Sequence, residues 1–198
     1  NMPGIPQGRL VLREGAMMAS SDYATITLTG IGGHGGLPHR TADPIVAAAV
    51  ALFAAHPDQW DRVRADRSLI PSAFNEVLRL HAPVHYFTRV TTQPVTIAGV
   101  ELAEGTRVLV MYGSANRDER RFPQPDRFDV TRNPTEQLAF GRGVHLCVGI
   151  NLARIEAHSL LAALADRVAR FEIDGAPHPL VNNTLHGYET LPVRVVAA

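Results

Sequence analysis

The sequence predicts a mixed α+β fold, mostly helical with small β-sheets, preceded by a short β-β-α segment. Three observations favour this class. Alternating apolar residues near the N-terminus are typical of strands, an apolar run followed by two shorter helical patterns is typical of packed helices, and a long amphipathic run near the C-terminus is typical of a helix covering a core. A chain of 198 residues is long enough to bury such a core.

The first fifty residues supply the β-β-α segment. "GRLVLREG" and "DYATITLTG" are typical of strands, and the second alternates apolar residues with threonines. Asp43 followed by Pro44 is a common helix start, so we expect a helix through "PIVAAAVALFAAH" that ends at Pro57.

The middle of the chain changes from helices to hairpins. "PDQWDRVRAD" and "PSAFNEVLRLHA" predict short helices, and the second ends before a proline. "PVTIAGVELAEGTRVLVMYG" then predicts short strands separated by turns at the glycines. The segment 114–137 has little apolar periodicity and three prolines, which indicates a meander or a surface loop.

The C-terminal part predicts one long helix followed by a strand and a turn. The run from Ile150 to Phe171 carries an apolar stripe along one side, and this stripe should face the core. Its members are Leu152, Ile155, Leu160, Leu161, Leu164 and Val168.

The composition narrows the class of protein. Lys+Arg and Asp+Glu are both 19, so the formal net charge is zero. This balance gives no indication that the protein binds nucleic acid or an anionic membrane surface. One cysteine excludes an internal disulfide framework and fits a reducing compartment. The apolar runs are shorter than the roughly 20 residues that span a bilayer, and no signal peptide is visible. We therefore expect a soluble cytoplasmic protein, and the start at "NMPG" suggests a fragment.

The cysteine lies in "FGRGVHLCVG", directly before the long helix. Gly141, Gly143 and Gly149 remove side chains on both sides of Cys147, so a flat ligand can approach the sulfur. The positive end of the helix dipole favours the thiolate form of Cys147, and a thiolate is suited to be an axial ligand for haem iron. His145 could reach a negative group at the edge of that ligand.

Two other interpretations of Cys147 stay open from the residues alone. Most single cysteines are small buried hydrophobic residues. A catalytic Cys/His pair is the third reading, although His145 being near in sequence is no evidence of one.

Three motifs in order resemble the cytochrome P-450 family. "FGRGVHLCVG" is similar to its haem-binding signature, with Phe140, Gly143, His145, Cys147 and Gly149 at the motif positions. "NEVLRLHAPV" is similar to its helix carrying Glu and Arg three apart, and "ANRDERRFPQPDRFDVTR" to its meander. This resemblance implies a structural cluster of Glu76, Arg79 and Arg127.

The resemblance also implies a cofactor and its contacts. Haem b would be held through its iron by Cys147, with His145 and Arg89 near the propionates and Phe140 packed near the sulfur. "PVHYFTR" and "NNTLHG" would face the substrate pocket.

The implied activity is insertion of one oxygen atom from O2 into a small organic substrate. The chain looks closest to soluble bacterial members that act on small aromatic acids. NAD(P)H would act only indirectly, through ferredoxin and ferredoxin-reductase partners.

Members of that family are much longer than this chain. Their central helix carries an acid–threonine pair for oxygen protonation, and no such pair precedes "FAAHPDQW" here. Monooxygenase activity of this chain alone is therefore in doubt.

Residues 1–50 resemble a different family, through "GGHGGLPH" and its surroundings. They look like the dimerisation (lid) domain of metal-dependent aminoacylases and hippurate-hydrolase-like amidohydrolases, in which the equivalent of His34 stabilises an oxyanion in a partner's site. The metal ligands of that family lie outside this segment, so we expect His34 to have no catalytic role. "GIGGHG" matches a dinucleotide motif only formally, because no acidic residue follows a second strand.

The sequence is therefore interpreted as a join near "PIVAAAVALF", between an incomplete lid-like segment (1–50) and an incomplete haem-thiolate domain (51–198). The alternative to the oxygenase is a non-catalytic haem-binding fragment or one that self-associates through residues 20–50. An amidohydrolase is the third reading, disfavoured by the missing metal ligands.

Overall fold

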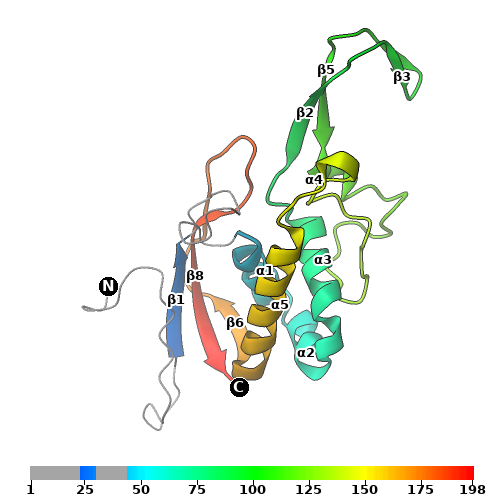
Figure 1. Ribbon diagram of the computed structural model, residues 1–198. Coiled ribbons are helices and arrows are strands. Elements are labelled where there is room, and N and C mark those ends of the chain that lie inside the picture. Colours follow the sequence, from blue (N-terminus) through cyan, green and yellow to red (C-terminus); the bar gives the residue numbers. More distant parts are fainter. Residues whose placement is uncertain (1–22, 30–43) are drawn as a thin grey trace.

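The computed structural model describes residues 23–29 and 44–198. A sheet forms one side of the molecule (Figure 1). Its strands run antiparallel in the order β1-β8-β6, and a short fourth strand, β7, also pairs with β8. Their bounds are β1 Tyr23–Thr29, β6 Val168–Ile173, β7 His178–Pro179 and β8 Tyr188–Ala197.

Helices α1, α2 and α5 pack against this sheet, and α1 and α5 lie between it and a further helix, α3 (Figure 1). The helices are α1 Pro44–Ala55, α2 Pro57–Ala65, α3 Ile70–Leu80 and α5 Ile150–Arg167. Aromatic side chains fill the core, where the rings of Phe53 and Trp60 lie 4.8 Å apart. Trp60 Nε1 also donates a buried hydrogen bond to the Val168 carbonyl at 3.0 Å, which ties α2 to β6.

Two small two-stranded sheets extend away from the helices (Figure 1). β2 pairs with β5 and β3 pairs with β4, both antiparallel. The bounds are β2 Tyr86–Val90, β3 Val95–Ile97, β4 Val100–Leu102 and β5 Arg107–Met111, followed by the one-turn helix α4 Tyr112–Ala115.

Most predicted elements are confirmed. The strand over 22–30, the three helices up to residue 82 and the short strands over 94–113 form where expected. The strand expected over 8–15, the Asp43 cap and His34 lie outside the described residues. The predicted domain boundary at residue 50 falls inside α1, which packs on α3, β6 and β8.

The predicted long helix is wrong at its C-terminal end. α5 ends at Arg167, and Val168 begins β6, which pairs with β8. A β-branched residue prefers a strand, and the ladder with β8 together with the Trp60 bond outweighs continuation of the helix.

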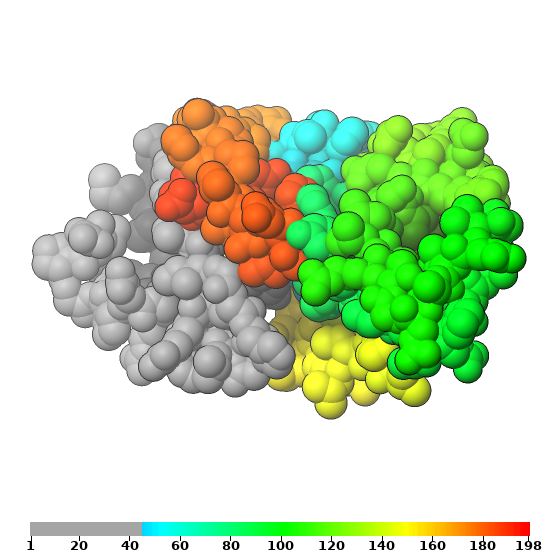
Figure 2. Space-filling view, turned by 90° about the horizontal axis from the view of Figure 1, so that it is seen from above, coloured from blue at the N-terminus to red at the C-terminus, as the bar shows by residue number. Residues whose placement is uncertain are grey.

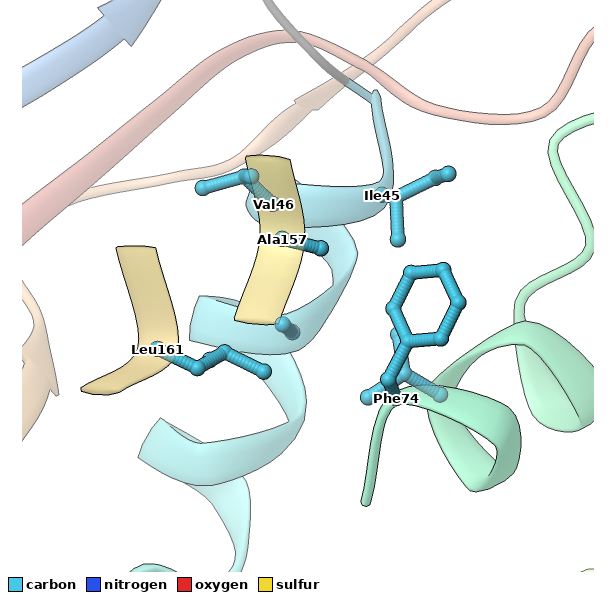
Figure 3. A pocket seen from close by; sticks show the side chains of 7 residues that line it. Ile45, Val46, Phe74, Ala157 and Leu161 are labelled. Atoms are coloured by element: carbon cyan, nitrogen blue, oxygen red, sulfur yellow. The ribbon is translucent and has the colours of Figure 1, made fainter. Parts of the chain in front are cut away.

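The predicted apolar stripe of α5 is also partly wrong. Leu152 and Ile155 are 49% and 65% exposed, and the buried residues of α5 are Ala157, Leu161 and Ala165. Figure 3 shows Ala157 and Leu161 at a small apolar pocket shared with α1 and α3. Alanines let helices approach closely, so the small residues face the core. Within the described residues no helix is long and apolar enough to cross a membrane.

Candidate functional site

The loop from Phe140 to Gly149 ends at the start of α5 and carries Cys147. The sulfur-bearing residue is exposed and follows a single 3-10 turn at Gly143–His145. The Cys147 amide donates to the Phe140 carbonyl at 2.8 Å, which closes the loop. In Figure 2 the segment that contains this loop (yellow) lies at the surface.

Two glycines make this closure sterically possible. Gly141 and Gly143 have φ of +71° and +62°, where other residues are strained. A Cβ at Gly141 would lie 2.7 Å from the His145 carbonyl oxygen, whereas one at Gly143 would meet nothing within 4 Å. A Cβ at Gly149 would lie 3.8 Å from Cys147 Sγ, an ordinary contact. Gly141 is therefore the position that the loop shape demands.

The surroundings of Cys147 suit a flat apolar ligand that carries a metal. Val144 and Val148 are 97% and 98% exposed, so apolar side chains on both sides of the cysteine are uncovered. A sulfur donor on an open glycine loop with an apolar rim fits an axial ligand and leaves space for a planar ring.

The other predicted ligand contacts are placed as follows. The ring of Phe140 packs against Phe74 of α3, with centroids 6.2 Å apart. His145 is exposed, and Arg89 lies on β2 with Nη1 donating to the Thr88 carbonyl at 3.0 Å. No hydrogen bond, ion pair or ring contact within the described residues joins His145 or Arg89 to Cys147.

Glu76 and Arg79 form a fully buried ion pair on α3. Arg79 Nε donates to Glu76 Oε2 at 2.8 Å and Nη2 to Oε1 at 2.9 Å. The remaining donors of Arg79 reach the segment 114–137, where they bond the carbonyls of Asn116, Pro125 and Arg127 at 2.9, 2.6 and 3.2 Å. The pair therefore fixes this segment onto α3, and the segment is an ordered meander.

The third member of this cluster is Arg132, and the expected Arg127 does not fill that place. Arg132 Nε donates to Glu76 Oε1 at 3.1 Å, and its other nitrogens donate to carbonyls of the meander. Arg127 contributes only its backbone carbonyl, and its exposed guanidinium donates to Gln124 at 3.1 Å. The two arginines are five residues apart, and only the course of the meander decides which one turns inward.

Asn116 is a buried polar residue that the sequence analysis missed. It is 0% exposed, and its Oδ1 accepts a hydrogen bond from the Leu138 amide at 2.8 Å. An asparagine in a polar loop resembles any solvated residue, so no local pattern signals it.

Three histidines also gather without any sequence signal. The rings of His81 and His186 stack 5.1 Å apart, and His85 lies 4.5 Å from His186. Burial, followed by the neighbouring His186, Arg117 and His85, lowers the pKa of His81 to about 4. Burial, with His85 and Arg117 nearby, also lowers the pKa of His186.

These histidines mark where residues 81–86 meet residues 182–187. The His85 amide donates to the Thr184 carbonyl at 3.0 Å, and the His186 amide donates to the Pro83 carbonyl at 2.8 Å. The structure thus brings together "PVHYFTR" and "NNTLHG", the two segments expected at a substrate pocket.

Comparison with known proteins gives a consistent result. Residues 54–187 match the family model for cytochrome P-450. The cytochrome P-450 CYP199A2 of Rhodopseudomonas palustris is 48% identical over 77% of this chain and 37% of its own length. Linalool 8-monooxygenase of Pseudomonas putida is 34% identical over 92% of this chain and 44% of its own length.

Solved structures agree with the sequence matches. The cytochrome P-450 CYP109Q5 of Chondromyces apiculatus superposes with a TM-score of 0.74 and 34% identity, covering 82% of this chain and 43% of that one. The chain spans less than half the length of the relatives it matches.

Proposed function

Because this chain belongs to the cytochrome P-450 family, we propose that it supplies the haem-binding part of a haem-thiolate monooxygenase. The observation that carries the proposal is the loop of Cys147. It is exposed, closed by a hydrogen bond to Phe140 and followed directly by α5. A sulfur donor held in this way is suited to be the fifth ligand of haem iron.

Haem, when bound, supplies the oxygen chemistry of the family, inserting one atom of O2 into a C–H bond. The chain's own part is to hold the ligand. Cys147 would donate the thiolate, and Gly143 and Gly149 would leave room for the ring. Phe140, packed on Phe74, would lie near the sulfur and limit access of water from that side.

His145 and Arg89 are proposed to bind the two propionates. Each carries hydrogen-bond donors that suit a carboxylate, and a guanidinium can bind one with two parallel bonds. His145 lies in a 3-10 turn and Arg89 lies on β2, and backbone hydrogen bonds hold both of these local structures. The structural cluster proposed alongside them consists of Glu76 and Arg79, with Arg132 in the place expected for Arg127.

The substrate and the electron donors are further proposals. Small organic molecules, among them small aromatic acids, would bind beside residues 83–89 and 182–187, which two backbone hydrogen bonds join. Electrons would come from NAD(P)H through a ferredoxin and its reductase. Relatives named as monooxygenases, including PikC of Streptomyces venezuelae, support the reaction type.

The experiment is to supply haem to the purified chain and record the spectrum of the reduced, carbon-monoxide-bound form. A red-shifted band typical of thiolate ligation is expected in the wild type and in Val100→Ser, which changes an exposed valine of β4 outside the proposed site. The band should be lost in Cys147→Ser. Haem with a histidine-type spectrum, or no haem at all, would overturn the proposal for this chain.

A second candidate function is self-association through the N-terminal segment, which resembles an amidohydrolase lid over residues 1–50. It is favoured by the position of β1 at the end of the order β1-β8-β6, because an edge strand can pair with another chain. Successive amides of a strand point to opposite sides, so Thr25→Pro and Ile26→Pro block opposite edges. A dimer in sedimentation that only one of the two variants abolishes would support this function, and a monomeric wild type would exclude it.

A further inference from the structure

Asn116 connects the buried ion pair of α3 to the cysteine loop. Its backbone carbonyl accepts a hydrogen bond from Arg79 Nη1 at 2.9 Å, and its side-chain Oδ1 accepts one from the Leu138 amide at 2.8 Å. Asn116 is 0% exposed; its bond with Arg79 is buried and its bond with Leu138 is partly buried, and an unmade bond at such a position is costly.

Leu138 lies two residues before the cysteine loop and is bonded to it. Its carbonyl accepts a hydrogen bond from the Gly141 amide at 2.8 Å, and the Phe140 carbonyl accepts one from the Cys147 amide at 2.8 Å. An uninterrupted series of hydrogen bonds and short backbone segments therefore runs from Arg79, through Asn116 and Leu138, to Cys147.

We propose that Asn116 is a positioning residue for Cys147: it fixes the start of the loop against the Glu76–Arg79 pair and so sets the height of the sulfur above α5. The inference rests on the proposed function, in which Cys147 is the axial ligand. Asn116 touches neither the sulfur nor a ligand and acts only through Leu138.

The side chain of Asn116 supports this role over simple packing. Its Nδ2 is buried and has no hydrogen-bond partner within the described residues. An apolar residue of similar size would avoid that cost if the position only had to be filled. The acceptor Oδ1 is the part that the loop uses, which accounts for an amide at this position.

The chain offers a matched control in Gln59. This residue is also buried, 4% exposed, and its Oε1 accepts a hydrogen bond from the Val130 amide in the same meander at 3.0 Å. Gln59→Ala and Asn116→Ala therefore remove the same kind of bond, but only the second should affect the loop. Asn116→Asp keeps an acceptor for the Leu138 amide and serves as the conservative variant.

The test is amide hydrogen exchange of the full chain without added haem, with the β6–β8 ladder as the internal reference. In Asn116→Ala, exchange at Cys147 should rise about tenfold relative to that reference, the factor equivalent to roughly 1.4 kcal/mol. In Asn116→Asp it should stay near the wild-type value. In Gln59→Ala only Val130 should exchange faster.

Unchanged exchange at Cys147 in Asn116→Ala would overturn the inference. An equal rise in Gln59→Ala would also overturn it, because the effect would then be general loosening. With haem supplied, the thiolate-type fraction of the carbon-monoxide spectrum should fall in Asn116→Ala and recover in Asn116→Asp. A wild type that binds no haem would refute the proposed function. The exchange experiment, which uses no haem, would still test the role of Asn116.

Discussion

Arg79 bonds Glu76 through two parallel hydrogen bonds, at 2.8 and 2.9 Å, and neither side chain is exposed. The two residues are one helical turn apart on α3, a spacing that on a helix surface contributes only a few tenths of a kcal/mol. Burial changes that value, because removing one partner leaves an uncompensated charge inside the protein. The pair is thus a structural centre whose loss affects the whole meander.

We predict that Glu76→Ala and Arg79→Ala each lower the free energy of unfolding by about 3–5 kcal/mol. Asp61→Ala is the control, since Asp61 and Arg64 have the same spacing on α2 at 3.9 Å and Asp61 is 70% exposed. It should cost a few tenths of a kcal/mol. Urea unfolding followed by circular dichroism measures all three, and equal losses would show that the α3 pair has no special role.

Arg132 and Arg127 give a second prediction. Arg132→Gln removes the contact with Glu76 at 3.1 Å and the bonds to meander carbonyls, so it should lower the unfolding free energy by about 2 kcal/mol. Arg127→Gln should change it by less than about 0.5 kcal/mol, because the backbone carbonyl that accepts from Arg79 remains. Thermal melts of both variants check the order, and a larger loss in Arg127→Gln would contradict it.

The glycines of the cysteine loop give a third prediction. Gly143→Ala should lower the free energy of unfolding by about 1–2 kcal/mol, because φ is +62° there. The added Cβ itself would meet no atom within 4 Å. Alanine at Gly141 should cost more, because its Cβ would also lie 2.7 Å from the His145 carbonyl. Thermal melts compare the two, and equal stability would mean that the loop relaxes around the methyl group.

The histidine cluster predicts a dependence of stability on pH. The pKa of His81 is about 4 in the folded protein against 6.5 for an ordinary histidine, so the unfolded chain binds the proton first on acidification. The free energy of unfolding therefore keeps its full value with respect to His81 above pH 6.5. It falls as the pH is lowered towards 4, by roughly 3 kcal/mol in all.

His81→Phe should flatten this dependence between pH 6.5 and 4, because the titrating group is gone. The exposed His178 provides the control, and His178→Phe should keep the wild-type slope. Urea midpoints at several pH values measure the slopes. Parallel curves for His81→Phe and wild type would show that His81 is not the group responsible.

The sequence by itself determined the helices α1, α2 and α3, the short strands β3, β4 and β5, and a cysteine loop just before α5, whereas the strand β2 was not predicted. These features depend on contacts between residues close in the chain, such as the proline after Asp43, the changing apolar period and the glycines around Cys147. The order of the three motifs was enough to predict the family that the matched region shows.

Only the tertiary structure decided the rest. Val168 became a strand residue because β8 and Trp60, distant in sequence, bind its backbone. Arg132 replaced Arg127 beside Glu76, and Asn116 became buried, because the course of the meander over α3 sets which side chains turn inward. Such outcomes depend on contacts between residues tens of positions apart, and no local pattern of residue types encodes them.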